Sequence, residues 1–460
     1  MPRPDLKNVE HAGSVYPSMS LSKRRAALVD ASPRFSANAQ PEGATEARRR
    51  QAVELFIAGR LEEAAGLFRA ELNLGDEGVS WMTDVIVNAM HAETLGDAGE
   101  LAAIFAHACH GGQLTSTERA ADRDSSQPRP MLSADKLRHD IEQLEYLRRH
   151  HIVGAEIDVI IANYEAIIAR LDAQGRETRT LMSDEDVGRI GHVYSRIVHV
   201  RDTPRLRQAL SPGWSRSDVE QRYLHHPQGI VVIDDFLTQD ALDDIWRFCL
   251  ESTVWLGNRY WYGRLGAFFL SGFNCPLLLQ VAEEVRAALP DVIGHRHPLQ
   301  QLWGFKYPSY LPPDSTIHAD FAAVNVNFWI TPDESNLDRS TGGLVIYDHG
   351  APANWDFRSY NEKLDMIKAY LQQNRACATR IPYRRNRAVI FNSDLFHATD
   401  EMNFRPGYED RRINITMLYG VRELDERYSA VSADGSPMQL QSGVSRMWRS
   451  PALLKIRVGG

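Results

Sequence analysis

The sequence has 460 residues, enough for two or three domains and a large apolar core. Hydrophobic residues (43%) and charged residues (24%) are as frequent as in ordinary soluble globular proteins, and a net charge of −8 argues against broad binding to nucleic acids or anionic membranes. The four cysteines are scattered without a Cys-x-x-Cys pair and no apolar run is long enough to span a bilayer, so we expect reduced thiols and a cytoplasmic location.

The N-terminal part of the chain is predicted to be helical after an irregular start. Residues 1–43 are polar and lack periodicity, so we expect a mobile leader. Residues 44–110 predict helical hairpins, and the stretch Ala52–Phe68 resembles one tetratricopeptide helix–turn–helix with Gly59 at its turn. A weaker echo begins at Leu95, but a stable array needs about three repeats, so an ordinary helical hairpin remains open.

A linker and a second helical region follow. Residues 111–131 have the glycine- and proline-containing polar composition of a linker. In residues 132–175, leucines and isoleucines at helical spacing predict a pair of helices, with Ser133 as the N-cap of the first. Residues 176–228 are basic and interrupted by prolines, which predicts an irregular connector. At the other end of the chain, residues 424–460 show no clear periodicity and are expected to form a tail.

A strand-rich domain is predicted over residues 229–423. It opens with a buried strand from Gly229 to Leu237 and a helix from Gln239 to Leu250, and a further helix is predicted from Pro276 to Leu289. A strand is then predicted over Trp303–Tyr307, just before the motif His318-Ala319-Asp320. Aromatic residues are concentrated before it, at Trp255, Tyr260, Trp261, Tyr262, Phe268 and Phe269. We expect most of these rings in the core, with one or two lining a pocket.

A histidine and a carboxylate occupy alternate positions in His318-Ala319-Asp320, just before the alternating strand Ala323–Ile330. Residues i and i+2 of an extended chain point to the same face, so His318 and Asp320 can bind one metal ion together. On a helix the same spacing turns two side chains roughly 200° apart. That divergence is expected for His91-Ala92-Glu93, which lies in a helical stretch.

The third metal ligand is predicted at His397. The run Ala388–Phe391 predicts a short buried strand that ends in an Asn-Ser-Asp turn, and His397 lies just beyond that turn, where a strand can bring a side chain to the rim of a site. Between the two histidines, residues 332–338 are expected to form a polar loop over the site, followed by a strand over Gly342–Tyr347. Residues 355–374 predict one helix.

Polar and apolar residues alternate in the last predicted strand, from Arg411 to Gly420. One face carries Arg412, Asn414 and Thr416, and the other carries Ile413, Ile415 and Met417. An arginine on a polar inner face suits an anionic co-substrate, because a guanidinium holds a carboxylate with two parallel hydrogen bonds. Arg411 points the opposite way and is expected to be a solvated surface charge.

Taken together, His318-Ala319-Asp320, His397 and Arg412-Ile413-Asn414 resemble the motifs of the Fe(II)/2-oxoglutarate-dependent dioxygenases, most closely the prolyl-4-hydroxylase-like branch. The resemblance covers residues 229–422. It implies an α+β fold, in which a C-terminal double-stranded β-helix (a jelly-roll or cupin-like barrel) with flanking helices follows an all-α N-terminal region.

The same resemblance implies roles for individual residues. His318, Asp320 and His397 would hold Fe(II), the ligand set of non-haem iron oxygenases. Arg412 would bind the far carboxylate of 2-oxoglutarate and complete the catalytic set. Asn414, Tyr307 and Asn327 are expected to be further contacts of the co-substrate.

The implied reaction consumes O2 and 2-oxoglutarate, releases succinate and CO2, and hydroxylates an amino-acid, peptide or protein-bound substrate, with ascorbate as a reductant. A small residue replaces the carboxylate in halogenating members of the family, so Asp320 points to hydroxylation. The N-terminal helices are expected to present a small-molecule, peptide or protein substrate. No nucleic acid or membrane partner is expected, and a homodimer remains open.

Three alternatives remain open. A non-redox cupin-like isomerase or binding protein could use the same ligands for another metal, although it would have no use for Arg412 as a carboxylate anchor. The helical region could dominate as an interaction module beside a degenerate barrel, although the intact ligands argue against degeneracy. The chain could also be a natural-product oxidase acting on a free small molecule.

Overall fold

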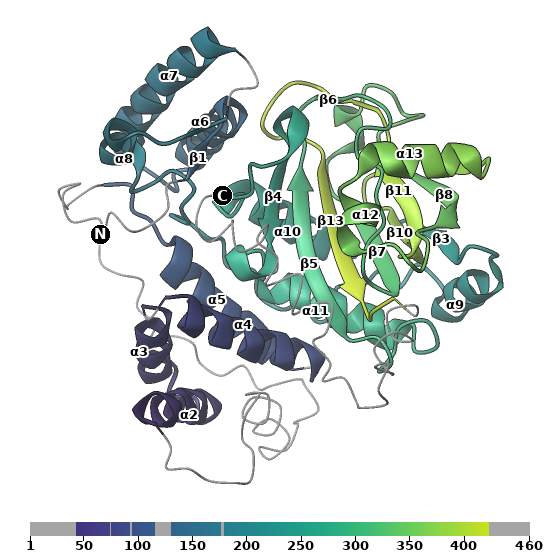
Figure 1. Cartoon of the computed structure of the whole chain (residues 1–460), viewed down its shortest axis with the longest axis horizontal. Coiled ribbons are helices and arrows are strands. Elements are labelled where there is room, and N and C mark those ends of the chain that lie inside the picture. Colours follow the sequence, from purple (N-terminus) through teal and green to yellow (C-terminus); the bar gives the residue numbers. More distant parts are fainter. Residues whose placement is uncertain (1–42, 74, 93, 116–129, 176–178, 423–460) are drawn as a thin grey trace. The chain divides into compact units, whose positions relative to one another are not determined.

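The computed structural model describes residues 43–73, 75–92, 94–115, 130–175 and 179–422 (Figure 1). The predicted tail, residues 1–42 of the predicted leader and residues 116–129 of the predicted linker lie outside these residues. Contacts divide the chain after Thr94 into two compact units, which we describe separately. None of the described helices combines the length and the apolar character needed to cross a lipid bilayer.

The first unit contains the helices α2 (Ala44–Ile57), α3 (Leu61–Leu72) and α4 (Asp76–His91). Gly59 allows the tight turn between α2 and α3, because its φ of +76° is strained for other residues. Aromatic rings form the core of this unit: Phe68 lies 6.3 Å from Phe56 and 5.8 Å from Trp81, measured between ring centroids. Helices α2 and α3 therefore form a packed hairpin, and a tetratricopeptide repeat stays a prediction.

The second unit contains the remaining helices: α5 (Leu95–His110), α6 (Ala134–Arg149), α7 (Ile157–Gln174), α8 (Asp184–Ile190), α9 (Arg216–His225), α10 (Gln239–Glu251), α11 (Pro276–Ala288), α12 (Phe357–Asn361) and α13 (Leu364–Gln373). Helices α8 and α9 lie in the connector that was predicted to be irregular. Both begin at a serine whose hydroxyl accepts a hydrogen bond from a backbone N–H, and Ser183 forms a full capping box with Asp186. These caps start helices despite the neighbouring prolines.

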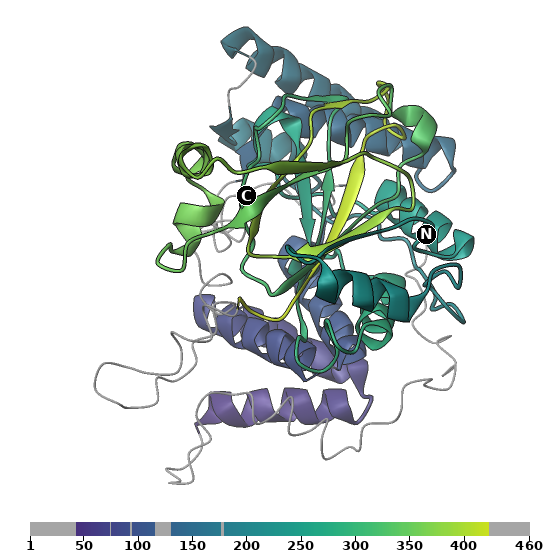
Figure 2. The same ribbon diagram turned by 90° about the vertical axis from the view of Figure 1, so that its right-hand side faces the viewer.

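The strands of the second unit form antiparallel sheets. They are β1 (Met131–Leu132), β2 (Thr180–Leu181), β3 (Ile230–Ile233), β4 (Leu265–Phe268), β5 (Leu299–Lys306), β6 (Tyr310–Leu311), β7 (Val324–Trp329), β8 (Leu344–Gly350), β9 (Ala378–Ile381), β10 (Ala388–Asn392), β11 (Leu395–Thr399), β12 (Met402–Asn403) and β13 (Ile413–Tyr419). The largest sheet has the order β3-β10-β7-β13-β5-β4, and a smaller one has the order β11-β8-β9. Figure 2 shows the smaller sheet in front of the larger one.

The two faces of the six-stranded sheet differ in polarity. On one face Phe328 packs against Phe236, with 5.4 Å between ring centroids, and the hydroxyl of Tyr419 donates to a carbonyl of α11. On the other face Asn327, Asn414 and Thr416 form hydrogen bonds with one another. The period-2 pattern of β7 and β13 therefore buries apolar residues under helices and turns polar residues toward the smaller sheet.

The helix predicted over residues 355–374 is two helices, α12 and α13, separated at Glu362 and Lys363. Lys363 has non-helical angles (φ −95°, ψ 73°). The chain is held there by the segment of the metal motif: the Asn361 side chain donates to the Ala319 carbonyl (3.0 Å), and the Ala319 N–H donates to the Tyr360 carbonyl (2.9 Å). These long-range contacts interrupt a helix that local spacing alone would continue.

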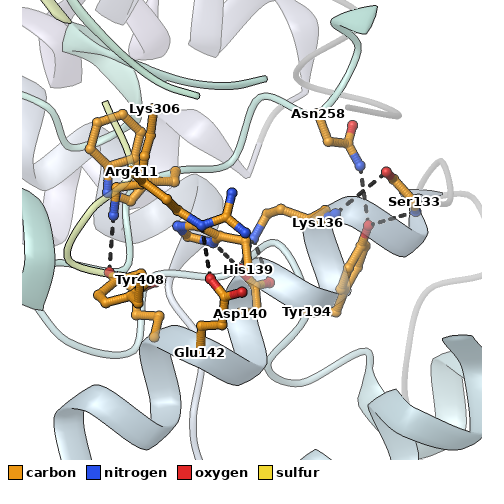
Figure 3. A network of polar contacts seen from close by, with 12 residues as sticks. Ser133, Lys136, His139, Asp140, Glu142, Tyr194, Asn258, Lys306, Tyr408 and Arg411 are labelled. Atoms are coloured by element: carbon orange, nitrogen blue, oxygen red, sulfur yellow. Dashed lines mark hydrogen bonds and ion pairs between the residues drawn. The ribbon is translucent and has the colours of Figure 1, made fainter. Parts of the chain in front are cut away.

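Helix α6 covers the start of β13, so the prediction that Arg411 is a solvated surface charge is wrong. The Arg411 side chain is only 13% exposed, and its Nε donates to a carboxylate oxygen of Glu142 at 2.8 Å (Figure 3). Beside it, the fully buried Lys306 donates to the hydroxyl of Tyr408 and to the carbonyl of Cys249, both at 3.0 Å. Arg411 is therefore part of a buried polar network, because α6 shields this edge of the sheet from water.

The buried His139 of α6 makes the stability of the protein sensitive to acid. Burial, together with the charges of Lys306, Arg411 and Lys136, holds the pKa of His139 well below 6.5. Below pH 6.5 the unfolded chain therefore binds a proton at this residue that the folded protein does not bind. The free energy of unfolding should fall by about 1.4 kcal/mol per pH unit for this group as the pH decreases below 6.5.

Urea unfolding of the metal-free protein between pH 7 and 5 measures this effect. His139→Asn keeps an amide near the Asp140 carboxylate, which lies 2.9 Å from the Nδ1 of His139. In this variant the free energy of unfolding should depend less on pH, by the equivalent of about one bound proton. His225→Asn, at an exposed histidine of α9, should retain the wild-type pH dependence. Equal slopes in wild type and His139→Asn would contradict the prediction.

Candidate metal centre

Two chain segments bring His318, Asp320 and His397 together. The backbones of His318 and His397 pair as an isolated antiparallel bridge, with N–H to carbonyl distances of 3.0 and 2.8 Å. The carboxylate of Asp320 is close to both rings: its oxygens are 3.8 Å from Nε2 of His318 and 3.4 Å from Nε2 of His397. The three ligand atoms lie within 4.8 Å of one another, and the residues that the structure describes contain no other group of this kind.

The backbone sets the orientation of both imidazoles. Nδ1 of His318 lies 2.6 Å from the Thr316 carbonyl, and Nδ1 of His397 lies 3.0 Å from the Leu395 carbonyl. A carbonyl oxygen only accepts hydrogen bonds, so each Nδ1 carries the proton. Each Nε2 then presents a free lone pair toward Asp320, which is the tautomer that a metal ion requires.

Electrostatics favours the metal-binding protonation state. Removal from water at the cavity wall and the nearby His397 lower the pKa of His318 to about 4, despite the opposing carboxylate of Asp320. Burial acts to raise the pKa of Asp320, but hydrogen bonds and the charges of both histidines lower it overall. One of these bonds comes from the side-chain amide of Asn325, which donates to Oδ2 at 2.8 Å. At neutral pH the site therefore offers the neutral imidazole of His318 and the carboxylate of Asp320.

Asn327 and Asn414, predicted to contact a co-substrate, both line the cavity next to the triad. Their side chains are already engaged with neighbours: Oδ1 of Asn327 accepts from Asn414 (2.9 Å) and Thr416 (2.7 Å), and Oδ1 of Asn414 accepts from Trp329 (2.9 Å). These bonds form a polar ladder along the floor of the cavity. The ladder fixes the side chains that surround the carboxylate of Asp320.

Tyr307 and Arg412 are adjacent but differ in access to the cavity. Tyr307 lines the cavity, and its hydroxyl lies 2.8 Å from the hydroxyl of Thr399. Arg412 is fully buried behind it, with Cζ 4.8 Å from the Tyr307 ring centroid, and is not among the residues that line the cavity. Its Nε donates to the Gly342 carbonyl at 2.6 Å, whereas Nη1 is buried without a hydrogen-bond partner among the described residues.

The cavity has a volume of about 530 Å³ and lies between the two sheets. Its floor is formed by the metal triad and the polar ladder, and its rim includes Phe357 and Asn361 of α12. The loop over residues 332–338, predicted to cover the site, does not line the cavity. Within it Ser335 is almost fully buried and its hydroxyl donates to Asp410 at 2.6 Å, so this loop braces the fold instead.

Four residues of the site were not predicted from the sequence. Asn325 was signalled by its parity with Asn327 on β7, because alternate residues share a face. Thr399 shares the face of His397 on β11 for the same reason. Asn361 and Arg264 carry no local signal, because their positions depend on contacts with residues far away in the sequence.

Of the aromatic cluster, Tyr260, Tyr262 and Phe268 line the cavity, and Trp255 and Phe269 are core residues.

No protein-family profile matches the sequence, and no curated protein matches it. Solved structures resemble about half of the chain. They include the non-heme alpha-ketoglutarate-dependent carbocyclase SnoK from nogalamycin biosynthesis (12% identity, TM-score 0.34, covering 50% of this chain and 96% of that one). A Pseudomonas putida prolyl-4-hydroxylase (12%, 0.30, 45% and 99%) and HygX from Streptomyces hygroscopicus with nickel and 2-oxoglutarate bound (14%, 0.30, 44% and 86%) also match.

Proposed function

We propose that the protein is a non-haem Fe(II)- and 2-oxoglutarate-dependent oxygenase that hydroxylates an amino-acid, peptide or protein-bound substrate. The observation that carries this proposal is the arrangement of His318, Asp320 and His397 at the floor of the cavity. These two imidazoles and one carboxylate would hold Fe(II) at the wall of the cavity, and they are the ligand set of non-haem iron oxygenases.

The fold supports the proposal through its order of strands. From β5 onward the chain alternates between the six-stranded sheet and the smaller sheets, except that β8 and β9, and likewise β11 and β12, follow each other in the smaller sheets. Such alternation is expected for a double-stranded β-helix. This order places β11, which carries His397, beside the segment after β6, which carries His318. We therefore assign residues 229–423 to a jelly-roll domain.

The residues present fit both groups that the proposal requires. Fe(II) would be held by the two Nε2 atoms and the Asp320 carboxylate, and Asn325 would fix that carboxylate. The unsatisfied Nη1 of Arg412 is a suitable donor to the far carboxylate of 2-oxoglutarate, with Tyr307 as a second contact. When bound, these groups supply oxidising power by coupling O2 reduction to the decarboxylation of 2-oxoglutarate.

The protein itself contributes placement and exclusion of water. The polar ladder holds the floor rigid, and the aromatic residues Trp303, Phe305 and Phe268 form an apolar wall beside the triad. An apolar wall displaces water from the reacting centre, which suppresses side reactions. The wall and the ladder thus have separate roles, one in excluding water and one in orienting the metal ligands.

Anaerobic titration of the purified full-length protein tests the proposal. Addition of Fe(II) and then 2-oxoglutarate should produce the weak visible charge-transfer absorption of the chelate, because both groups then share one metal site. Admission of O2 in the presence of substrate should then release succinate. Iron binding without any such band would contradict the proposal and favour a non-redox, cupin-like metal-binding isomerase or binding protein.

A further inference from the structure

A loop at the entrance of the cavity, Gly257–Gly266, is held in one place by hydrogen bonds; we call it the mouth loop. Its ends pair with each other, with N–H to carbonyl distances of 2.9 and 2.8 Å between Gly257 and Gly266. Its tip turns at Tyr262 (φ +60°) and Gly263 (φ +68°), and the second of these positions favours glycine. A side chain at position 263 would also meet the carboxylate of Asp135 at 3.0 Å.

Met131 of β1 and Tyr194, which follows α8, support this loop. Asn258 donates to the Met131 carbonyl at 2.8 Å and to the hydroxyl of Tyr194 at 3.1 Å, and that hydroxyl also accepts from the Ser133 N–H at 3.2 Å (Figure 3). Ser133 is the N-cap of α6. The same helix that shields Arg411 thus also fixes the entrance of the cavity.

Arg264, at the end of the mouth loop, lines the cavity. Its Cζ lies 4.6 Å from the ring centroid of Tyr260, 4.7 Å from that of Phe305 and 5.7 Å from that of Tyr307. None of the residues that the structure describes offers Arg264 a carboxylate at ion-pair distance. Its described partners are these rings and the hydroxyl of Tyr307, with which its side chain forms a hydrogen bond, so its positive charge meets no carboxylate.

The acidic residues of the cavity do not change this balance. Asp320 is reserved for the metal, and Glu362, on the α12 side of the rim, is paired with Arg358 at 3.2 Å. A second arginine of the mouth loop, Arg259, lines the same entrance and stacks on Tyr260 at 5.2 Å. Arg264 therefore gives the entrance a positive charge next to the apolar wall of Trp303, Phe305 and Phe268.

We propose that the mouth loop recognises a small organic carboxylate with a flat apolar body, whose anionic group binds Arg264 while its body lies on the aromatic wall. This inference rests on the proposed function, because it assigns the substrate of the same cavity. The two arginines beside Tyr307 differ in access to the cavity: Arg412 is fully buried and does not line it, whereas Arg264 does. Arg412 therefore suits the co-substrate, and Arg264 suits the substrate.

Two probes of the same shape test the inference on the full chain. Binding of 1-naphthoate and of its neutral analogue 1-naphthamide is measured by calorimetry, under argon, to protein loaded with Fe(II) and 2-oxoglutarate. Wild type should bind the carboxylate at least about tenfold more tightly, as expected for a charge-assisted contact. Arg264→Met should reduce this preference to less than about threefold, and Arg264→Lys should keep part of it.

The matched control is Arg339→Met, which removes the same charge at an exposed position outside the cavity and should keep the wild-type preference. Equal binding of the two probes by wild type, or an unchanged preference in Arg264→Met, would overturn the inference. So would a loss of 2-oxoglutarate affinity in Arg264→Met, since Arg264 would then hold the co-substrate. Failure of the proposed function is distinct: the charge-transfer band would be absent, and the probe preference would still be measurable on metal-free protein.

Discussion

His397→Ala should abolish both iron binding and 2-oxoglutarate turnover. The variant leaves only His318 and Asp320, a two-ligand site without the histidine that lies 3.4 Å from the carboxylate. Loss of a partner that merely orients a ligand already costs about 10- to 100-fold in metal affinity, so loss of a ligand should cost on the order of a hundredfold or more. Iron affinity is measured by anaerobic titration, and turnover by succinate release.

The control for this prediction is His225→Ala, which removes an exposed histidine on α9 and should leave both quantities unchanged. The thermal midpoint of the metal-free His397→Ala protein is needed as well, because its ring packs 4.9 Å from Phe391 and 4.5 Å from His318. A folded His397→Ala protein that still binds iron with wild-type affinity would show that His397 is not a metal ligand. Asp320→Asn offers a second test, since it keeps the volume of the side chain and removes its charge.

The proximity of His318, Asp320 and His397 could be predicted because much of its geometry is local. The positions of His318 and Asp320 relative to each other follow from an extended backbone, in which alternate side chains share a face. The polar faces of β7 and β13 follow from the same rule, and the structure places Asn327, Asn414 and Thr416 together. His397 needed one further step, the expectation that a short buried strand ends at the rim of the sheet.

Features decided by distant partners could not be predicted. Arg411 looked like a solvated charge because nothing near it in the sequence indicates that α6 covers it. The break between α12 and α13 depends on hydrogen bonds to Ala319, which lies about forty residues earlier in the chain. Arg264 is the clearest case: its position depends on a loop that is anchored by Met131 and Tyr194.

Arg412 is expected to contribute more to co-substrate binding than to stability. Burial lowers the pKa of its guanidinium, an effect that the neighbouring Tyr307 and Tyr383 oppose, and no described carboxylate forms an ion pair with it. A buried cation without an ionic partner costs several kcal/mol. Arg412→Met should relieve this cost while leaving the Gly342 carbonyl unpaired, at about 1–3 kcal/mol, so the two effects should largely cancel. Urea unfolding without co-substrate should therefore give a free energy within about 2 kcal/mol of wild type.

The affinity for 2-oxoglutarate should change much more than the stability. Loss of one partner of a buried charge pair costs about 3–5 kcal/mol, so the dissociation constant should rise on the order of a hundredfold or more in Arg412→Met. The dissociation constant of Arg412→Lys for 2-oxoglutarate should lie between those of wild type and Arg412→Met, because lysine keeps the charge and loses the second hydrogen bond. If Arg412 instead served mainly to hold Gly342 and Gly343 in place, Arg412→Met should lose much stability and keep an almost unchanged affinity for 2-oxoglutarate. Unchanged affinity without a loss of stability would indicate that the anchor is Arg264, the guanidinium beside Tyr307 that lines the cavity.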